Sequence, residues 1–258
     1  MLEQLAKSII AETSGYSAEE LLKYAVDKFG GRVALASSFG VEDQVLTDML
    51  CKITGRPKST LVDGTPKTFT PNAAGPRIFT LDTGRLAQQT YDVMDETRKK
   101  YGIKIRALFP DYKQIEEMVT EHGPNLFYES VELRKLCCKY RKIEPLKKEL
   151  ADLDVWICGL RAGQSTTRTE LQSVQVDEAF GLIKICPLAD WTEQQVWDYI
   201  KENDVPYNKL HDEGYPSIGC EPCTRAIEKG EDVRAGRWWW EEPIQKECGL
   251  HLKAKDEK

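Results

Sequence analysis

Short apolar runs alternate along this chain with longer segments of helical periodicity, and this alternation constrains the fold more than any other feature. The apolar runs are rich in Val, Ile and Leu and end in polar turns, which is the pattern of buried strands. Strands that alternate with helices form a parallel sheet with helices on both faces. We therefore predict an α/β fold that binds ligands at the carboxyl ends of its strands. The predicted strands are residues 33–39, 77–81, 103–108, 155–160 and 182–187, and the predicted helices are residues 18–28, 42–51, 86–101, 112–122, 136–150 and 192–203.

Two stretches interrupt this alternation. Residues 54–76 are rich in Gly, Pro, Thr and Lys and have no apolar period, so we predict a long surface loop there. From His211 onward, Gly, Pro and Cys accumulate and the regular pattern stops. We therefore predict an α/β portion at residues 1–210 and a C-terminal segment at residues 211–258, which together form a single functional domain.

The bulk composition bounds the class of protein. A chain of 258 residues can bury a full core, so its eight cysteines are not needed as structural disulfides. A net charge of −6 argues against a nucleic-acid surface. The first 15 residues lack the basic start and apolar block of a secretory signal, and no apolar run approaches the roughly 20 residues of a membrane span. We expect a cytoplasmic protein that binds neither nucleic acid nor membrane.

Polar turns rich in Gly, Ser and Thr follow three of the predicted strands. The first begins at Ser37, the second contains Asp82, and the third covers residues 159–168. At a strand-to-helix turn, free backbone N–H groups and the positive end of the helix dipole face any bound anion. Each turn alone is also explained by helix capping and tight backbone geometry. Three such turns at one sheet edge favour a nucleotide site, although the first lacks the Gly-Lys-Ser/Thr ending of a Walker A loop.

Four cysteines form the strongest chemical signal. Cys137 and Cys138 are adjacent, and Cys220 and Cys223 form a Cys-x-x-Cys motif that begins 82 positions after the pair. Four thiolates suit Zn²⁺ or an iron–sulfur cluster. Because side chains of sequential residues diverge, the adjacent pair fits a bulky [4Fe–4S] cluster better than a tetrahedral zinc ion. The basic residues near the pair, which either form a solvated helix face or balance an anionic cluster and substrate, are Arg134, Lys139, Arg141 and Lys142.

The C-terminal segment combines two arginines, three consecutive tryptophans and a lone cysteine. Arg234 and Arg237 either bind phosphate or sulfate oxygens or are ordinary surface residues of an interface. Tryptophans at 238–240 cannot all face one core, so at least one packs on a ring, a base or a partner. Cys248 has basic neighbours that favour its thiolate and an acidic one, Glu247, that opposes it. It is either a stray thiol or a nucleophile.

Taken in order, these motifs closely resemble those of the assimilatory adenylyl-sulfate (APS) reductases, relatives of the phosphoadenylyl-sulfate (PAPS) reductases. The resemblance spans residues 30–252. It rests on the segments at residues 37–43, 81–85, 137–146, 219–223, 236–241 and 246–251.

The resemblance implies a Rossmann-like sheet of the adenine nucleotide α-hydrolase type and a two-step thiol mechanism. Cys248 is the implied nucleophile, which takes the sulfonate from adenosine 5′-phosphosulfate as S-sulfocysteine and releases AMP. Thioredoxin, or glutaredoxin, then attacks Cys248 and frees sulfite. The resemblance also implies a [4Fe–4S] cluster with an electrostatic and structural role, and its implied ligands are Cys137, Cys138, Cys220 and Cys223.

The substrate contacts are carried over position by position from the same resemblance. The matching residues are Ser37, Ser38, Phe39, Gly40, Leu81, Asp82, Thr83, Gly84, Arg85, Lys142, Arg161, Arg234, Arg237 and His251. Members of the family with the four cysteines mostly use APS, so we expect APS rather than PAPS as the substrate. Residues 54–76 are longer than the family's usual link at this point, which puts the assembly in question; we expect a homo-oligomer.

Two other functions compete with a reductase. An adenylating or sulfurating ATP pyrophosphatase would use the same sheet, but its pyrophosphate loop needs close backbone approach where Phe39 stands here. A non-catalytic metal protein would hold zinc at the four cysteines and leave Cys248 idle. Pyrophosphate release from ATP would identify the first, and metal analysis with a Cys248→Ser variant would identify the second.

Overall fold

A computed structural model describes residues 1–55, 77–164 and 171–242. Its centre is a six-stranded sheet in the order β3-β2-β1-β4-β6-β5, in which every neighbouring pair is parallel except β5 with β6. The strands are β1 (Val33–Ala36), β2 (Ile78–Leu81), β3 (Arg106–Leu108), β4 (Val155–Cys158), β5 (Val174–Asp177) and β6 (Leu182–Ile185). The predicted loop at residues 54–76 falls almost entirely outside the described residues.

The five predicted strands are confirmed, and the sheet is parallel as predicted except at one edge. There β5, which the sequence analysis missed, pairs antiparallel with β6. The strand is only four residues long and ends in the charged Asp177, so it lacks the pattern of a buried strand. Asp177 is nevertheless buried, because it forms an ion pair with Lys184 on β6.

All six predicted helices are present, and one more, α1, precedes them. Ser17 and Thr192 begin α2 and α8 with capping boxes, which satisfy the free N–H groups of the first turn. The helix predicted at 136–150 begins earlier, where the Ser130 side chain accepts a hydrogen bond from the backbone N–H of Leu133, and a π-helical turn at Lys139–Ile143 divides it into two helices, α6 and α7. The helices are α1 (Leu2–Glu12), α2 (Ala18–Phe29), α3 (Val41–Thr54), α4 (Gln88–Tyr101), α5 (Tyr112–His122), α6 (Val131–Cys138), α7 (Glu144–Leu150) and α8 (Glu193–Glu202).

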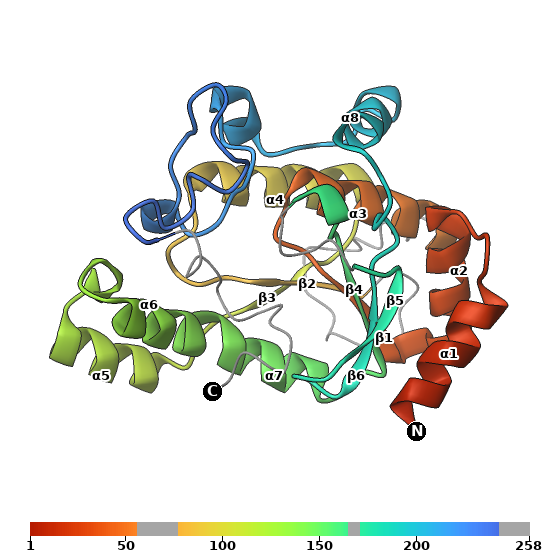
Figure 1. The fold of residues 1–258 in the computed structure, drawn as a ribbon, viewed down its shortest axis with the longest axis horizontal. Coiled ribbons are helices and arrows are strands. Elements are labelled where there is room, and N and C mark those ends of the chain that lie inside the picture. Colours follow the sequence, from red (N-terminus) through yellow and green to blue (C-terminus); the bar gives the residue numbers. More distant parts are fainter. Residues whose placement is uncertain (56–76, 165–170, 243–258) are drawn as a thin grey trace, which may run out of the picture.

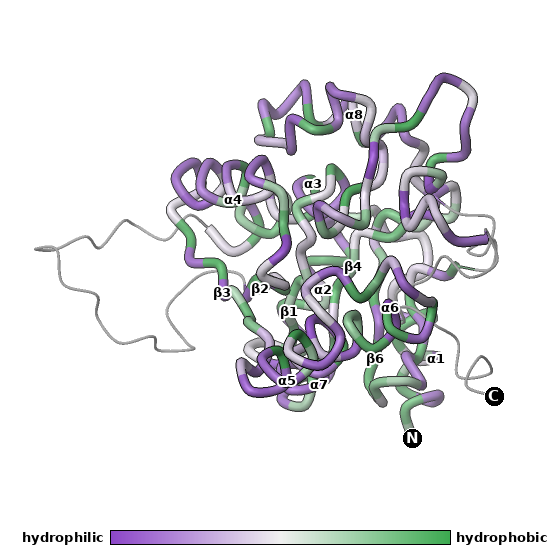
Figure 2. The backbone as a smooth tube through the Cα atoms, turned by 90° about the vertical axis from the view of Figure 1, so that its left-hand side faces the viewer, coloured by the Kyte–Doolittle hydropathy of each residue, from purple (hydrophilic) through white to green (hydrophobic). Residues whose placement is uncertain are grey.

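Helices cover both faces of the sheet, as predicted (Figure 1). Alternate residues of β1 point to opposite faces: Leu35 joins the core formed with α1, α2, α3 and α8, whereas Ala34 joins the core formed with α7. Figure 2 shows the hydrophobic strands in the middle and hydrophilic segments on the outer helices. Among the described residues, no helix combines the length and the apolar character that a membrane crossing requires.

The described part of the C-terminal segment, residues 211–242, packs at the end of the sheet beside α5 and α6 (Figure 1). A third hydrophobic cluster joins α5 and α6 to the four motif cysteines and Trp238. Isolated bridges link Leu86 with Cys220 and Thr224 with Arg237. Directly after the adjacent cysteines, residues Lys139–Ile143 form a π-helical turn, a rare geometry that is frequent at functional sites. Residues 211–242 are therefore held against the α/β portion by both backbone and apolar contacts.

Candidate functional site

A cavity lies at the carboxyl ends of β1, β2 and β4, which are neighbours in the sheet. The three predicted turns meet there, as expected for parallel strands. We call it the nucleotide pocket, after the ligand class that the turns predict. Of the predicted site residues, those that line it are Ser37, Ser38, Gly40, Leu81, Thr83, Lys142, Cys220, Arg234 and Arg237.

The turn after β1 is held by a buried carboxylate. Asp43 Oδ2 accepts hydrogen bonds from the backbone N–H and the hydroxyl of Ser38, at 2.6 and 2.7 Å. Phe39 has φ 61° and is 1% exposed, so its ring is buried while its backbone adopts a conformation that side chains disfavour. The predicted contact Phe39 does not line the pocket, whereas Asp43, which the sequence analysis did not assign, does.

The turn after β2 connects the pocket with the cysteines. Asp82 accepts hydrogen bonds from the Gly84 N–H and the Tyr91 hydroxyl, both at 2.9 Å, so it shapes the turn. The Thr83 hydroxyl lies 3.2 Å from Cys220 Sγ. Arg85 points away from the pocket, where it donates to the Pro124 carbonyl at 2.9 Å.

The predicted contact Arg161 is engaged by an acidic partner. Its Nε lies 2.7 Å from Glu42 Oε1, and both side chains are about nine-tenths buried. The sequence analysis did not assign Glu42, although both it and Asp43 belong to the motif that begins at Ser37. The signal that could have identified them is their position in the first turn of a helix that opens on the pocket.

The four motif cysteines surround a second, smaller cavity, which we call the cysteine cavity. All four are buried, although α6 carries two of them and the C-terminal segment the other two. Lys142, Cys220 and Trp238 line both cavities, so the two spaces share a wall. Within the described residues, no group of three or more His, Cys, Asp or Glu side chains is arranged to hold a metal ion. The thiols are spread around a shared space instead.

Positive side chains surround the cysteine cavity. Arg134, Arg141 and Lys142 line it, together with Arg85, which lies over the Phe127 ring. Arg141 also donates to the Thr83 carbonyl at 2.7 Å and so ties the π-turn to the turn after β2.

These cations act unequally on the thiols. Burial raises the pKa of the Cys137 thiol and brings that of Cys223 to about 12. At Cys220 burial is opposed and outweighed by Lys142 and by the hydrogen bond from Thr83, so the pKa of this thiol is lowered. Cys220 is thus more readily deprotonated than Cys137 or Cys223.

The tryptophan segment is locked between two arginines. Trp238, with φ 41°, is 1% exposed, and the guanidinium groups of Arg134 and Arg237 lie 4.7 and 4.8 Å from its ring centre. Arg134 also forms a buried ion pair with Glu241 at 2.7 Å. Arg237 packs closely on Gly219, where an added Cβ would lie 2.3 Å from its guanidinium, and it donates to the Ile218 carbonyl at 3.1 Å. Arg237 is therefore fixed at the pocket wall.

His211, to which the sequence analysis gave no role, lines the nucleotide pocket. Its ring packs edge-on against Trp197, and burial lowers its pKa. Its Nε2 is buried and has no hydrogen-bond partner within the part of the chain that the structure describes. Two predicted site residues, Cys248 and His251, lie outside that part.

Comparison with known proteins shows the family of this chain. A family model described as the phosphoadenosine phosphosulfate reductase domain matches residues 32–226. An adenosine 5′-phosphosulfate reductase of Burkholderia cepacia is 50% identical over 221 residues, which cover 86% of this chain and 81% of the relative. The enzyme of that name from Neisseria meningitidis serogroup A is 41% identical over 245 residues, 93% of each chain.

A solved structure supports the same relationship. The phosphoadenylyl-sulfate (PAPS) reductase from Candida auris, in a phosphate complex, superposes with a TM-score of 0.65 at 28% identity, over 88% of this chain and 96% of that one. This similarity confirms the Rossmann-like, adenine nucleotide α-hydrolase-like fold. The chain therefore belongs to the phosphoadenosine phosphosulfate reductase family, a family of oxidoreductases that includes these adenosine 5′-phosphosulfate reductases.

Proposed function

We propose that this protein reduces adenosine 5′-phosphosulfate to sulfite and AMP in assimilatory sulfate reduction, with thioredoxin or glutaredoxin as the reductant. The observation that carries the proposal is the shared wall of the two cavities, where Lys142 and Cys220 face both. A nucleotide held by the strand-end turns would thus lie next to the cysteines. The names of the relatives from Burkholderia and Neisseria support APS as the substrate.

In the first step, the Cys248 thiolate attacks the sulfur of APS. A bond forms between Cys248 Sγ and this sulfur, while the bond from the sulfur to the bridging oxygen breaks and AMP leaves with the electron pair. Lys142, Arg234 and Arg237, at the pocket wall, would stabilise the charge that develops on the phosphate, and His251 is assigned the same role.

In the second step, a thiolate of thioredoxin attacks Cys248 Sγ. Sulfite leaves, a mixed disulfide forms, and the second thiol of thioredoxin resolves it and regenerates the Cys248 thiol. Each turnover thus oxidises one dithiol to a disulfide and reduces the sulfonate sulfur by two electrons. Cys248 must reach both substrate and thioredoxin from the chain that follows residue 242.

The cysteine cavity fits the proposed [4Fe–4S] cluster by its chemistry. Cys137, Cys138, Cys220 and Cys223 would bind it, since four buried thiols face one space. A single tetrahedral zinc ion, with bonds of about 2.3 Å, would need the thiols to converge on one point. When bound, the cluster supplies a compact anionic group that balances the surrounding cations and links the C-terminal segment to α6. We assign it no change of oxidation state.

The remaining assignments belong to the same proposal. Residues 1–210 bind the nucleotide and begin the cluster site, and residues 211–258 complete the site and carry the nucleophile. We propose that the protein is cytoplasmic and forms a homo-oligomer. For the substrate, the alternative is a reductase that acts on PAPS or on both nucleotides. The rival ATP pyrophosphatase needs close backbone approach at the turn after β1. The Phe39 ring is buried and does not line the pocket, so release of pyrophosphate from ATP is the test for this rival.

The test is to mix anaerobically purified protein with APS or PAPS in the absence of any reductant. Mass spectrometry of the intact protein and its peptides should find one added sulfonate on Cys248 with APS, and none in a Cys248→Ser control. An adduct with both nucleotides would keep the mechanism and withdraw the preference for APS. No adduct from either, with iron present, would overturn the proposed function.

A further inference from the structure

The first turn of α3 is tied to two separate turns of the nucleotide pocket by one buried carboxylate. Asp43 Oδ2 accepts from the Ser38 N–H and hydroxyl, in the turn after β1. Asp43 Oδ1 accepts from the backbone N–H of Gly159, in the turn after β4, at 3.2 Å. Because β1 and β4 are neighbours in the sheet, this carboxylate bridges the two turns across one pocket wall.

The contact with the second turn is close enough to demand a glycine. A Cβ at Gly159 would lie 2.3 Å from Asp43 Oδ1 and 2.9 Å from the Asp43 backbone nitrogen. The neighbouring pair Glu42–Arg161 joins the same two elements at 2.7 Å. The turn after β4 is therefore attached to α3 at two adjacent points. At one of them the turn has a glycine, Gly159, whose lack of a side chain allows the close contact.

We infer that Asp43 is a positioning residue, which holds the Ser38 and Gly159 turns at the separation at which they bind the nucleotide part of the substrate. The inference rests on the proposed function, since it takes the pocket's ligand to be an adenine nucleotide. Asp43 would contact the turns and not the reacting atoms. Its role follows from what its two oxygens accept: hydrogen bonds from the two turns whose residues Ser38 and Gly159 line the pocket.

Replacing Asp43 should change nucleotide affinity in opposite directions depending on whether Asp43 positions the turns or acts only through its charge. Asp43 is a carboxylate beside a pocket that would hold a phosphate ester. If it acted only through its charge, removing that charge would strengthen the binding of an anion. If it positions the turns, its removal weakens binding. An asparagine at 43 keeps the shape but can accept from only one of the two turns and sets an N–H group against the other.

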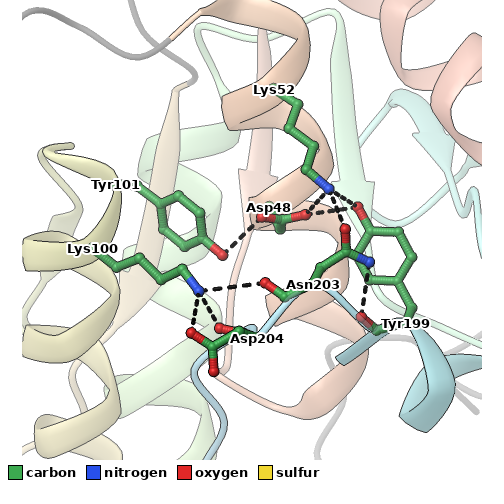
Figure 3. A network of polar contacts seen from close by, with 7 residues as sticks. All are labelled: Asp48, Lys52, Lys100, Tyr101, Tyr199, Asn203 and Asp204. Atoms are coloured by element: carbon green, nitrogen blue, oxygen red, sulfur yellow. Dashed lines mark hydrogen bonds and ion pairs between the residues drawn. The ribbon is translucent and has the colours of Figure 1, made fainter. Parts of the chain in front are cut away.

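A second buried carboxylate on the same helix provides the matched control. Asp48, 3% exposed, accepts from the hydroxyls of Tyr101 and Tyr199 at 2.9 and 2.7 Å and pairs with Lys52 at 2.7 Å. Figure 3 shows these side chains meeting with Asn203 in a network that joins α3, α4 and α8. Asp48 is as buried and as bonded as Asp43, but its partners belong to helices and their ends rather than to the pocket turns.

The experiment compares Asp43→Asn with Asp48→Asn in the cluster-loaded protein. We measure AMP affinity by calorimetry, kcat and KM with APS, and the melting temperature. Asp43→Asn should weaken AMP binding about tenfold and raise KM by a similar factor with kcat changed less than about threefold, because the lost interaction serves ground and transition states alike. Asp48→Asn should lower the melting temperature and leave AMP affinity within about twofold, as expected for uncoupled sites.

Two results would overturn the inference: unchanged or tighter AMP binding by Asp43→Asn, or equal losses of affinity in both variants. If Asp43→Asn does not fold, Gly159→Ala tests the same contact from the other side, because its added Cβ pushes the turn away from Asp43. Normal AMP affinity in folded Gly159→Ala would then reject the inference. Failure of the wild-type protein to bind AMP or turn over APS would instead count against the proposed function.

Discussion

The two cavities share a wall but are built in opposite ways. The nucleotide pocket is formed by turns that follow neighbouring strands, and carboxylates such as Asp43 and Asp82 fix those turns through backbone N–H groups. The cysteine cavity is formed by segments 82 positions apart, and cations such as Arg134 and Arg141 fix its walls.

This difference indicates which interactions stabilise each cavity. In the pocket, Asp43 and Asp82 already accept hydrogen bonds from the turns, so we expect the pocket to keep its shape without a ligand. Around the cysteine cavity, several positive groups face thiols whose thiolate forms burial disfavours. We expect this second region to depend on its bound anionic group and the first to be independent of it.

The largest expected effect is on the cysteine cavity alone. Cys137→Ser removes a ligand of the proposed cluster at a residue that lines the cysteine cavity and not the nucleotide pocket, so iron content and sulfite formation should fall, the latter by more than about 100-fold. AMP affinity should change little, because the strand-end turns keep their own hydrogen bonds. Iron analysis, a sulfite assay and calorimetry measure the three quantities.

Cys51→Ser serves as the matched control, since Cys51 is buried in α3 but lines neither cavity. It should retain iron and turnover. If Cys137→Ser kept its iron, the assignment of this ligand would be wrong. If it lost AMP binding together with iron, the two regions would not be independent.

The next effect concerns the stability of the same region. Glu241→Gln leaves the Arg134 guanidinium without its carboxylate, and breaking a buried ion pair costs about 3–5 kcal/mol of unfolding free energy. Urea unfolding under anaerobic conditions measures the loss. The exposed pair Lys23–Asp27 is the control, and Lys23→Ala should produce no measurable change. Equal losses of unfolding free energy at the two pairs would contradict the view that the Arg134–Glu241 ion pair anchors the C-terminal segment to α6.

Sequence reasoning succeeded where topology alone decides the outcome. Strands that alternate with helices bring their carboxyl-end turns to one edge, so the pocket followed from the pattern of apolar runs. The exact ends of the strands could not be predicted from that pattern. Residues 33–39 look like one strand because Phe39 is apolar, yet β1 stops at Ala36 and Phe39 turns its backbone to φ 61° while burying its ring.

Other features depend on contacts between residues that no local sequence pattern relates. The strand β5 was missed because Asp177 is hidden by a pairing with Lys184 that no local pattern reveals. The joint cavity of Cys137 and Cys220 came from motif spacing and resemblance, since periodicity does not relate segments so far apart. Asp43 and Arg141 act through backbone groups of other turns, and such long-range partners exist only once the chain has folded.

A smaller effect should appear as a pH dependence of substrate binding. Burial raises the pKa of Asp43 from its usual 3.8 to about 6, against the opposing hydrogen bonds from Ser38. A proton on this carboxyl turns one acceptor oxygen into a donor, so KM for APS should rise several-fold as the pH falls from about 7 to 5. The same shift means that the folded protein holds this proton more tightly than the unfolded chain. Its contribution to the unfolding free energy therefore declines as the pH rises from about 4 to 6.

The effect of Asp43 on KM must be distinguished from the effects of the other ionisable groups nearby. Glu42 with Arg161, Cys158 and His211 lie close, but burial keeps the Cys158 thiol neutral by raising its pKa well above the usual value, and burial lowers that of His211. Asp43→Asn isolates the contribution of Asp43: its KM should be high and flat over the same range. A wild-type KM independent of pH between about 5 and 7 would contradict the predicted titration.

The smallest effects belong to the helix network in Figure 3, which lies outside both cavities. Tyr101→Phe and Tyr199→Phe each remove one hydroxyl bonded to Asp48, and one such bond contributes about 1 kcal/mol to the unfolding free energy. Tyr101→Phe should cost more, because Asp48 Oδ2 keeps Lys52 when Tyr199 is changed, whereas Oδ1 has Tyr101 as its hydrogen-bond donor. Chemical unfolding resolves the difference, and AMP affinity should stay constant in both variants. If either tyrosine changed nucleotide binding, α3 would transmit strain from its C-terminal half to the turns at its N-terminus, and the separation of stability from substrate binding along this helix would fail.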